Sequence, residues 1–153
     1  MHQVTIQVSD PTSPEARRLI EQLDGYLTAL YPPESNHLLS VEALRQPGVT
    51  FLMAWLEDQA IGCGAFVNRE GEYAEVKRMF VLPGFRGLQV GRRLLDELES
   101  LARQAGLALA RLEAGVLQPE ALRLYERAGY LRRGPFGGYP DDPLSVFMEK
   151  PLA

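Results

Sequence analysis

The chain has 153 residues and is acidic, with 16 lysines and arginines against 20 aspartates and glutamates and a formal net charge of -4. This length suits one domain, so we expect a single unit over residues 1–153. A composition of 46% hydrophobic and 24% charged residues excludes disordered, collagen-like and coiled-coil chains. The acidic balance argues against a surface that binds nucleic acid or anionic lipid.

Cysteine and histidine are scarce. One cysteine, Cys63, and two histidines are too few for a disulfide framework, a CxxC zinc site or a histidine-rich metal centre, so we expect no metal. No apolar run approaches the roughly 18 residues of a membrane span, and the amino terminus lacks a charged leader followed by an apolar core. The sequence therefore predicts a cytoplasmic protein without membrane contact, and it leaves a homodimer open.

The predicted elements begin with a strand over Val4–Val8, where apolar and polar residues alternate. A helix should follow, because Ser13 can cap it and Pro14 suits its first turn. Apolar residues then recur at helical spacing from Ala16 to Leu30, which indicates one apolar face along this helix.

The middle of the chain changes from helical to strand patterning. A short helix is predicted over residues 40–45, before Pro47 and Gly48 break the chain. Three strands follow with separators short enough for hairpins, so we expect an antiparallel meander. The predicted strands cover residues 50–56, 60–68 and 74–82.

A long helix is predicted over residues 89–105, and Gly106 is placed to end it in a left-handed conformation. The remaining predicted elements are a strand over 107–113, a helix over 119–128 and strands over 130–133 and 145–150. Strands and helices in this mixture form an α+β or α/β sheet packed by helices on its faces.

The most informative stretch is residues 77–95, where a strand passes through a glycine-bearing turn directly into the long helix. The first turn of a helix exposes unpaired backbone N–H groups and a partial positive charge, and both attract phosphate. Gly87 and Gly91 would let such a ligand approach. Cations in a first helical turn oppose the helix dipole, so the arginines here either hold an anion or extend into solvent. They are Arg86, Arg92 and Arg93.

At these residues the chain resembles the GNAT superfamily of acyl-CoA-dependent N-acetyltransferases. The family signature [Q/R]xxGx[G/A] falls on residues 86–91, with Gln89 where the family usually has glycine. Residues 120–130 resemble a second hallmark, a helix that ends in a tyrosine before a glycine-aromatic pair. The tail resembles that of a YsnE-like bacterial subgroup. The resemblance implies a central, mostly antiparallel twisted sheet of about seven strands with helices on both faces.

The resemblance also implies acetyl-CoA as the acyl donor. Backbone groups of the strand that carries Met79, Phe80 and Val81 would hold the pantetheine arm. Gln118 stands where the family often has an asparagine that contacts the coenzyme, although it could simply cap the following helix. Backbone amides would hold the pyrophosphate; they belong to Arg86, Gly87, Leu88, Gln89, Val90, Gly91 and Arg92.

Two side chains are candidates for acid-base chemistry. By the resemblance, Tyr125 would protonate the departing thiolate, because a phenol stays protonated until sulfur needs the proton; packing on the core is the alternative. Glu75 is our candidate to accept the amine proton, with a solvated strand glutamate as the alternative. Strand alternation predicts that Glu75 shares a face with Lys77 and Met79. We expect Cys63 to be a buried apolar residue.

Two loops are candidates for substrate recognition, with ordinary polar loops as the alternative. The first holds Tyr31 and His37, and the second combines aromatic and acidic residues that would suit a small cation or a peptide amine. The second set is Phe136, Tyr139, Asp141 and Asp142.

We therefore expect an N-acetyltransferase that moves an acetyl group from acetyl-CoA to a primary amine of a small molecule or peptide by direct attack in a ternary complex. Gln89 inside the phosphate turn motivates a second hypothesis, a non-catalytic acyl-CoA-binding or sensing domain. A nucleotide-binding module without acyl chemistry is a third.

Overall fold

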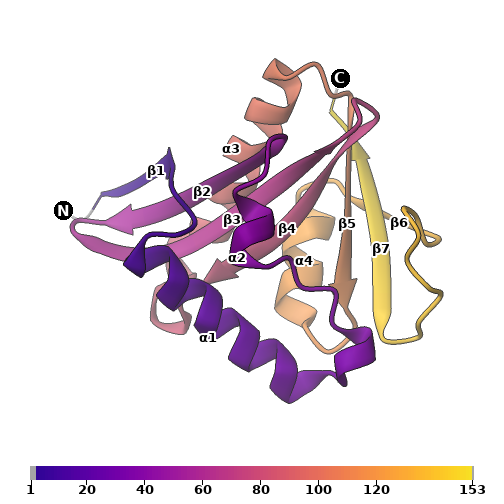
Figure 1. The fold of residues 1–153 in the computed structure, drawn as a ribbon, viewed down its shortest axis with the longest axis horizontal. Coiled ribbons are helices and arrows are strands. Elements are labelled where there is room, and N and C mark those ends of the chain that lie inside the picture. Colours follow the sequence, from indigo (N-terminus) through magenta and orange to yellow (C-terminus); the bar gives the residue numbers. More distant parts are fainter. Residues whose placement is uncertain (1–2, 153) are drawn as a thin grey trace.

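Seven strands form one sheet in the order β1-β2-β3-β4-β5-β7-β6 in the computed structural model, which describes residues 3–152 (Figure 1). All neighbouring strands are antiparallel except β4 and β5. The predicted meander and mostly antiparallel sheet are confirmed. The strands are β1 (Val4–Val8), β2 (Val49–Leu56), β3 (Gln59–Arg69), β4 (Tyr73–Val81), β5 (Leu109–Gly115), β6 (Leu131–Arg133) and β7 (Ser145–Pro151).

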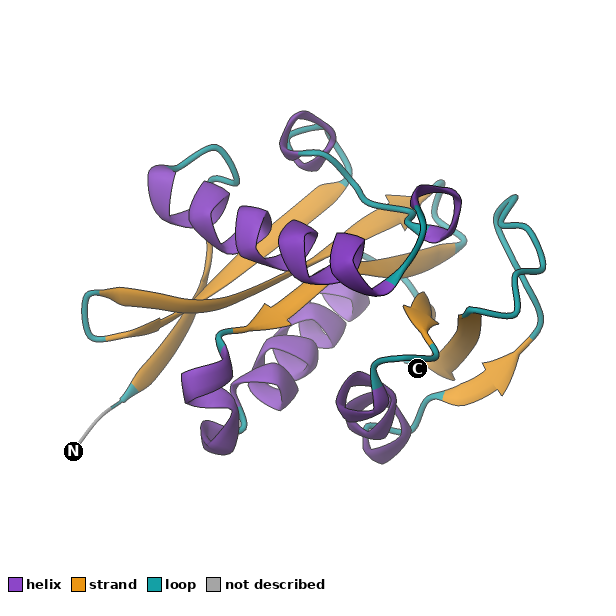
Figure 2. Ribbon diagram, turned by 90° about the horizontal axis from the view of Figure 1, so that it is seen from below, coloured by secondary structure: helices purple, strands orange, loops and turns teal. Residues whose placement is uncertain are grey.

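Helices cover both faces of this sheet, as expected (Figure 2). The helices α1 (Pro14–Leu30) and α2 (Val41–Leu44) pack on one face, and α3 (Val90–Gln104) and α4 (Pro119–Arg127) pack on the other. Two short 3-10 helices, η1 (Pro33–Ser35) and η2 (Pro83–Leu88), fall in segments where the sequence predicts loops. No helix within residues 3–152 is both long and apolar enough to cross a membrane.

The two apolar layers follow the predicted helix faces. Leu19 and Leu23 of α1 pack over Met53 and Cys63, while Leu94 of α3 lies in the cluster on the opposite side of the sheet. Burial of one such leucine side chain contributes about 1.5–3 kcal/mol. Cys63 is fully buried, which confirms that expectation, and burial raises the pKa of its thiol to about 12.

The end of α3 explains why β5 begins at Leu109 and not at the predicted residue 107. Gly106 takes a left-handed conformation, with φ of 84°. The N–H of Leu107 then bonds to the carbonyl of Ala102 and that of Gly106 to the carbonyl of Arg103. This Schellman motif uses Leu107 to satisfy the last helical carbonyls, so the strand starts two residues later.

A bulge in β4 changes which side chains share a face. Lys77 pairs with Ala65 and Phe80 with Cys63, so Arg78 and Met79 together oppose Gly64. Arg78 has a φ of 60°, and its side chain turns toward α1. Glu75 and Lys77 do share a face, but the predicted position of Met79 with them is wrong, because the extra residue sends Met79 to the α3 side.

The parallel contact between β4 and β5 is short. Only Ala74–Val76 pair with Ala110–Leu112, and beyond these residues β4 stays with β3 while β5 stays with β7. The strand ends therefore separate, with α4 behind the gap (Figure 1). Such a fork leaves backbone N–H and C=O groups on the facing edges without strand partners.

Tyr31 joins the end of α1 to the β5 side of this fork. It is buried at the end of α1, and its hydroxyl accepts a hydrogen bond from the N–H of Leu117 and donates one to Oε1 of Gln118. Its ring lies against Gly115, where a Cβ would stand 1.8 Å from the Tyr31 hydroxyl oxygen. Gly115 is therefore required by this close approach.

We predict that Gly115→Ala destabilises the protein by about 1–3 kcal/mol, because Tyr31 has to leave its site to make room. Urea denaturation measures the change in the free energy of unfolding. Gly134→Ala is the matched control, since a Cβ there meets nothing within 4 Å. Equal stability of the two variants would contradict the close packing of Tyr31 on Gly115.

Candidate active site

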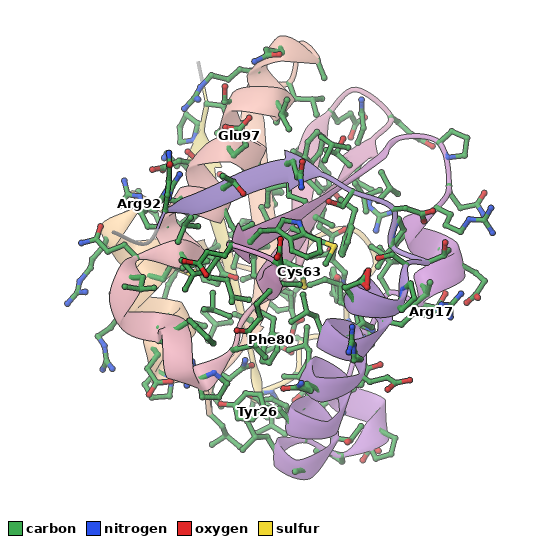
Figure 3. The ribbon with its side chains drawn as sticks, turned by 90° about the vertical axis from the view of Figure 1, so that its left-hand side faces the viewer. Arg17, Tyr26, Cys63, Phe80, Arg92 and Glu97 are labelled. Carbon is green, nitrogen blue, oxygen red and sulfur yellow. The ribbon has the colours of Figure 1, made fainter. Side chains whose placement is uncertain are left out.

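A cavity of about 510 Å³ lies between the end of β4, the turn into α3, and α4, with α1 closing one side. We call it the large cavity. Its volume is in the range of small-molecule sites. Tyr26, Phe80 and Arg92, labelled in Figure 3, are among its lining residues. The predicted coenzyme residues that line it are Met79, Phe80, Val81, Arg86, Gln89, Gly91, Arg92 and Gln118.

Three other predicted coenzyme residues, Gly87, Leu88 and Val90, do not line the large cavity, and the side chain of Val90 is fully buried in the core. Their predicted contribution is a backbone one. Gln89 has φ of 57° and ψ of 29° and precedes the first residue of α3. This left-handed conformation costs a non-glycine residue roughly 1–2 kcal/mol, which explains why glycine is usual here.

The start of α3 offers its backbone to a ligand. Within the described chain no side chain caps it at Gln89, and its first turn contains no acidic residue. The N–H groups of Val90, Gly91 and Arg92 have no intrahelical acceptor, because the first such bond runs from Arg93 to Gln89. These N–H groups and the helix dipole favour an anion at this turn.

Arginines from η2, α3 and α4 line the large cavity. Arg86 lies 3.5 Å from a carboxylate oxygen of Glu120, which is the one acidic residue among the lining residues. Arg92 bonds to Asp96, while Arg93 does not line the cavity. A locally positive rim therefore exists in a chain of net charge -4. The lining arginines are Arg86, Arg92, Arg123 and Arg127.

Two of these arginines were absent from the sequence prediction. Arg123 and Arg127 lie four residues apart on α4, so they share a helix face. Their spacing is visible in the sequence, but an exposed helix carries such pairs routinely. Only the docking of α4 beside α3 directs this face to the turn at residues 86–91.

A second cavity of about 100 Å³ adjoins the first, and we call it the small cavity. Its walls come from the segment after η1, from the bulged part of β4 and from β5 beyond the fork. The two cavities share Leu23, Met79, Gln118, Ala121 and Tyr125. A ligand in one can therefore meet a ligand in the other at these residues.

Tyr125 stands where the two cavities meet. Its side chain is 7% exposed, and its ring packs edge-on against Tyr130 with centroids 5.9 Å apart. Burial raises the pKa of Tyr125 well above its usual value of 10, so its hydroxyl carries its proton at neutral pH. The ring therefore packs on the core and also lines both cavities, while the predicted acid role of Tyr125 stays a prediction.

Gln118 lines both cavities and precedes α4, but its side chain makes no capping hydrogen bond to that helix. Its Oε1 accepts the bond from Tyr31. The capping alternative is therefore not realised, and Tyr31, a predicted substrate residue, orients Gln118 from outside both cavities.

Glu75 lies outside both cavities and is 2% exposed. One carboxylate oxygen is 2.9 Å from Nε and 2.8 Å from Nη2 of Arg69. The other accepts the hydroxyl of Tyr139 and lies 3.8 Å from Nζ of Lys77. Both oxygens are thus occupied, and the structure does not bring Glu75 together with Tyr125.

Glu113 on β5 is the carboxylate that lines the small cavity, and sequence reasoning missed it. Burial raises its pKa, although Ser145 donates a hydrogen bond of 2.9 Å to Oε2. It forms no ion pair with another residue in the described part of the chain. Alternation on β5 directs Ala110 and Leu112 to the α3 core and Glu113 to the opposite face. Only the fork opens that face to a cavity.

The two predicted substrate loops contact each other. His37 and its neighbours line the small cavity, whereas the second loop packs outside it. Tyr139 places its ring edge-on to His37, 5.0 Å between centroids, and Asp142 accepts the hydroxyl of Ser35. Phe136 lies in an aromatic cluster with Tyr73 and Phe147. The second loop therefore packs against the first one on the side away from the small cavity.

Within residues 3–152 the structure contains no group of three or more His, Cys, Asp or Glu side chains that could hold a metal ion.

The fold and the cavities together define an acyl-CoA-dependent acetyltransferase, and the comparisons agree. The profile of the Acetyltransferase (GNAT) family matches residues 16–130. The chain is 52% identical to the IAA acetyltransferase of Azospirillum brasilense, over 99% of this chain and 100% of the relative. It is 34% identical to YsnE, an uncharacterized N-acetyltransferase of Bacillus subtilis, over 96% of this chain and 99% of the relative.

A crystal structure of a Klebsiella pneumoniae protein, assigned as an acyl-CoA N-acyltransferase, superposes with a TM-score of 0.86 at 39% identity and covers 99% of both chains. The chain belongs to the GNAT acetyltransferase family. It is an acetyl-CoA-dependent N-acetyltransferase, and the relationships do not favour a non-catalytic sensing domain.

We predict that Glu113→Gln makes the protein more stable at neutral pH. Because its pKa is raised, Glu113 holds its proton more tightly in the native state than in the unfolded state. The free energy of unfolding therefore falls as the pH rises past 4.5, the usual pKa of glutamate, and Glu113 ionises. Glutamine removes that penalty at pH 7 and changes little below pH 4.5. Thermal denaturation across this pH range measures the difference, at roughly 2–4 °C per kcal/mol.

Glu149→Gln is the control with the opposite sign. Arg133 and Arg111 hold the pKa of Glu149 below its usual value, so this variant loses stability at neutral pH and the loss shrinks as the pH falls. A destabilised Glu113→Gln at pH 7 would contradict the assignment of Glu113 as a partly buried carboxylate without an ion pair.

Proposed function

We propose that the acceptor is a small primary amine that binds in the small cavity and attacks the thioester of acetyl-CoA directly. One observation carries this proposal: Tyr125 and Glu113 both line the small cavity, and Tyr125 also lines the large one. A protonated phenol and a carboxylate are the two proton-transfer groups that such an attack requires. The small volume favours a small molecule over a peptide.

The donor would lie in the large cavity. The unpartnered edge of β4 from Met79 to Val81 suits the amide groups of the pantetheine arm, and the N–H groups that open α3 suit the pyrophosphate. The arginines of α4 add positive charge near the coenzyme phosphates. This arrangement would bring the thioester to Tyr125, where the cavities meet.

All bond changes and proton transfers of the reaction would occur within one ternary complex. The amine nitrogen attacks the acetyl carbonyl carbon, the N–C bond forms and the C–S bond breaks. Glu113 accepts the amine proton directly or through water, and Tyr125 gives its proton to the departing thiolate. The partly buried carboxylate of Glu113, which has no ion pair, also attracts the ammonium form of the acceptor before reaction.

The proposal assigns a different role to Glu75. With Arg69, Lys77 and Tyr139 the buried Glu75 carboxylate forms a polar network next to the first substrate loop. Lys77 donates a hydrogen bond of 2.8 Å to the carbonyl of His37. Glu75 therefore acts as a positioning residue for this loop.

The relative in Azospirillum brasilense adds one compound to the acceptors worth testing, because its name gives IAA as the compound it acetylates. A screen with acetyl-CoA should therefore include IAA beside primary amines and amino acids.

The proposal also includes a single domain over residues 1–153, a cytoplasmic location and a homodimer. The one continuous sheet supports the single domain.

Tyr125→Phe should slow acetyl transfer by about 10²-fold or more, because the thiolate then leaves without a proton donor. The affinity for coenzyme A should change little, since the phenylalanine ring keeps the packing against Tyr130. Steady-state kinetics and calorimetric titration with coenzyme A measure the two quantities. Undiminished turnover would contradict the assignment of Tyr125 as the acid.

Glu113→Gln should lower kcat/KM by about 10²- to 10⁴-fold, and Glu75→Gln should lower it much less at matched protein stability. The raised pKa of Glu113 also places the acidic limb of the wild-type pH–rate profile above pH 4.5, and this limb should vanish in Glu113→Gln. Profiles of kcat/KM from pH 4 to 9 compare the variants. The reverse order of the two losses would restore Glu75 as the base.

A further inference from the structure

Most polar side chains of the small cavity already have partners in the protein. The hydroxyl of Ser35 donates to Asp142, and the amide of Asn36 donates to the carbonyls of Leu27 and Tyr31. These bonds fix the wall of the cavity and leave those groups little capacity for a ligand.

The two cations of the cavity are engaged as well. Nζ of Lys77 donates to the carbonyl of His37 at 2.8 Å and to the hydroxyl of Tyr139 at 2.9 Å. Arg78 donates from Nε to the carbonyl of Leu39 at 2.9 Å and from Nη1 to Asp24 at 2.6 Å. Their positive charge still acts on the cavity, where it favours an electronegative atom and opposes a second ammonium group.

His37 is different. Its Nε2 is buried and has no hydrogen-bond partner among the described residues, although the side chain lines the small cavity. An unsatisfied buried polar atom is costly and rare in native proteins, so each one calls for an explanation. The Tyr139 ring on one side and the Lys77 bond to the His37 carbonyl hold the imidazole in place. Such a fixed, unpaired group suits recognition of a ligand.

We propose that the acceptor carries an oxygen atom besides its reacting amine, and that Nε2 of His37 donates a hydrogen bond to that oxygen. This inference rests on the proposed function, because Glu113 is then the partner of the amine. A hydroxyl and a carboxylate oxygen share the required chemistry, so the acceptor class is small amino alcohols and amino acids. A cavity built to bond such an oxygen rejects an amine that lacks it, since Nε2 then stays buried and unpaired.

Three acceptors of similar size test the inference: ethanolamine, glycine and propylamine. The measured quantity is the ratio of kcat/KM for each oxygen-bearing amine to that for propylamine, expressed per concentration of free amine. We expect at least one ratio to reach about 10 to 100 in the wild type. Ethanolamine and glycine distinguish a hydroxyl from a carboxylate as the recognised oxygen.

His37→Phe removes the donor but keeps an aromatic ring against Tyr139, and it should bring the ratio close to one. His37→Gln restores an N–H donor and should recover part of the preference. Glu34→Gln, on the exposed part of η1, is the control and should keep the wild-type ratio. Coenzyme A affinity checks folding of each variant, because His37 does not line the large cavity.

Calorimetric titration of the preferred amine into the protein–coenzyme A complex gives a second readout, and His37→Phe should weaken this binding by a similar factor. A preference that survives in His37→Phe, or a wild type that acetylates propylamine as well as the other two, would overturn the inference and leave the proposed function intact. Transfer to none of the amines, with IAA and other candidates also inert, would contradict the proposed function and this inference with it.

Discussion

The short parallel contact between β4 and β5 determines where every group of the site lies. Three residues of each strand pair, and then each strand remains with its antiparallel neighbour. The bulge at Arg78 bends β4 at the point of separation and reverses the faces of the residues after it. Both cavities occupy the resulting fork. A sheet with a continuous β4–β5 ladder would have no edge for a coenzyme and no opening beside Glu113.

The charged side chains around this fork differ in whether they have a partner of opposite charge. Glu75 and Arg78 are buried, Lys77 is partly buried, and each has a partner of opposite charge, so they stabilise the loop that carries His37. Glu113 is partly buried without an ion pair, and this burial raises its pKa and reduces stability at neutral pH. Reactive groups are commonly held in such unfavourable surroundings. The contrast supports the different roles that we propose for these two glutamates on adjacent strands.

The fold could be predicted from the sequence, and the turn at residues 86–91 could be located there, because their signals are local. Ser13 caps α1 and Gly106 ends α3 as their residue types imply, and the turn at residues 86–91 carries its own signature. The acceptor side depends on long-range packing. Neither the bulge that turns Met79 away nor the fork that exposes Glu113 leaves a local pattern, and the contact of Tyr31 with Gly115 spans 84 residues of chain.

The central claim is that the forked edge of β4 and the first turn of α3 form the donor site. Titration of ¹⁵N-labelled protein with coenzyme A, followed by amide NMR, tests it most directly. We expect the largest shifts at the amides of Met79, Val81, Val90 and Gly91, with the distant strand β1 unaffected. Binding that leaves those four amides unchanged and shifts residues elsewhere would contradict this account.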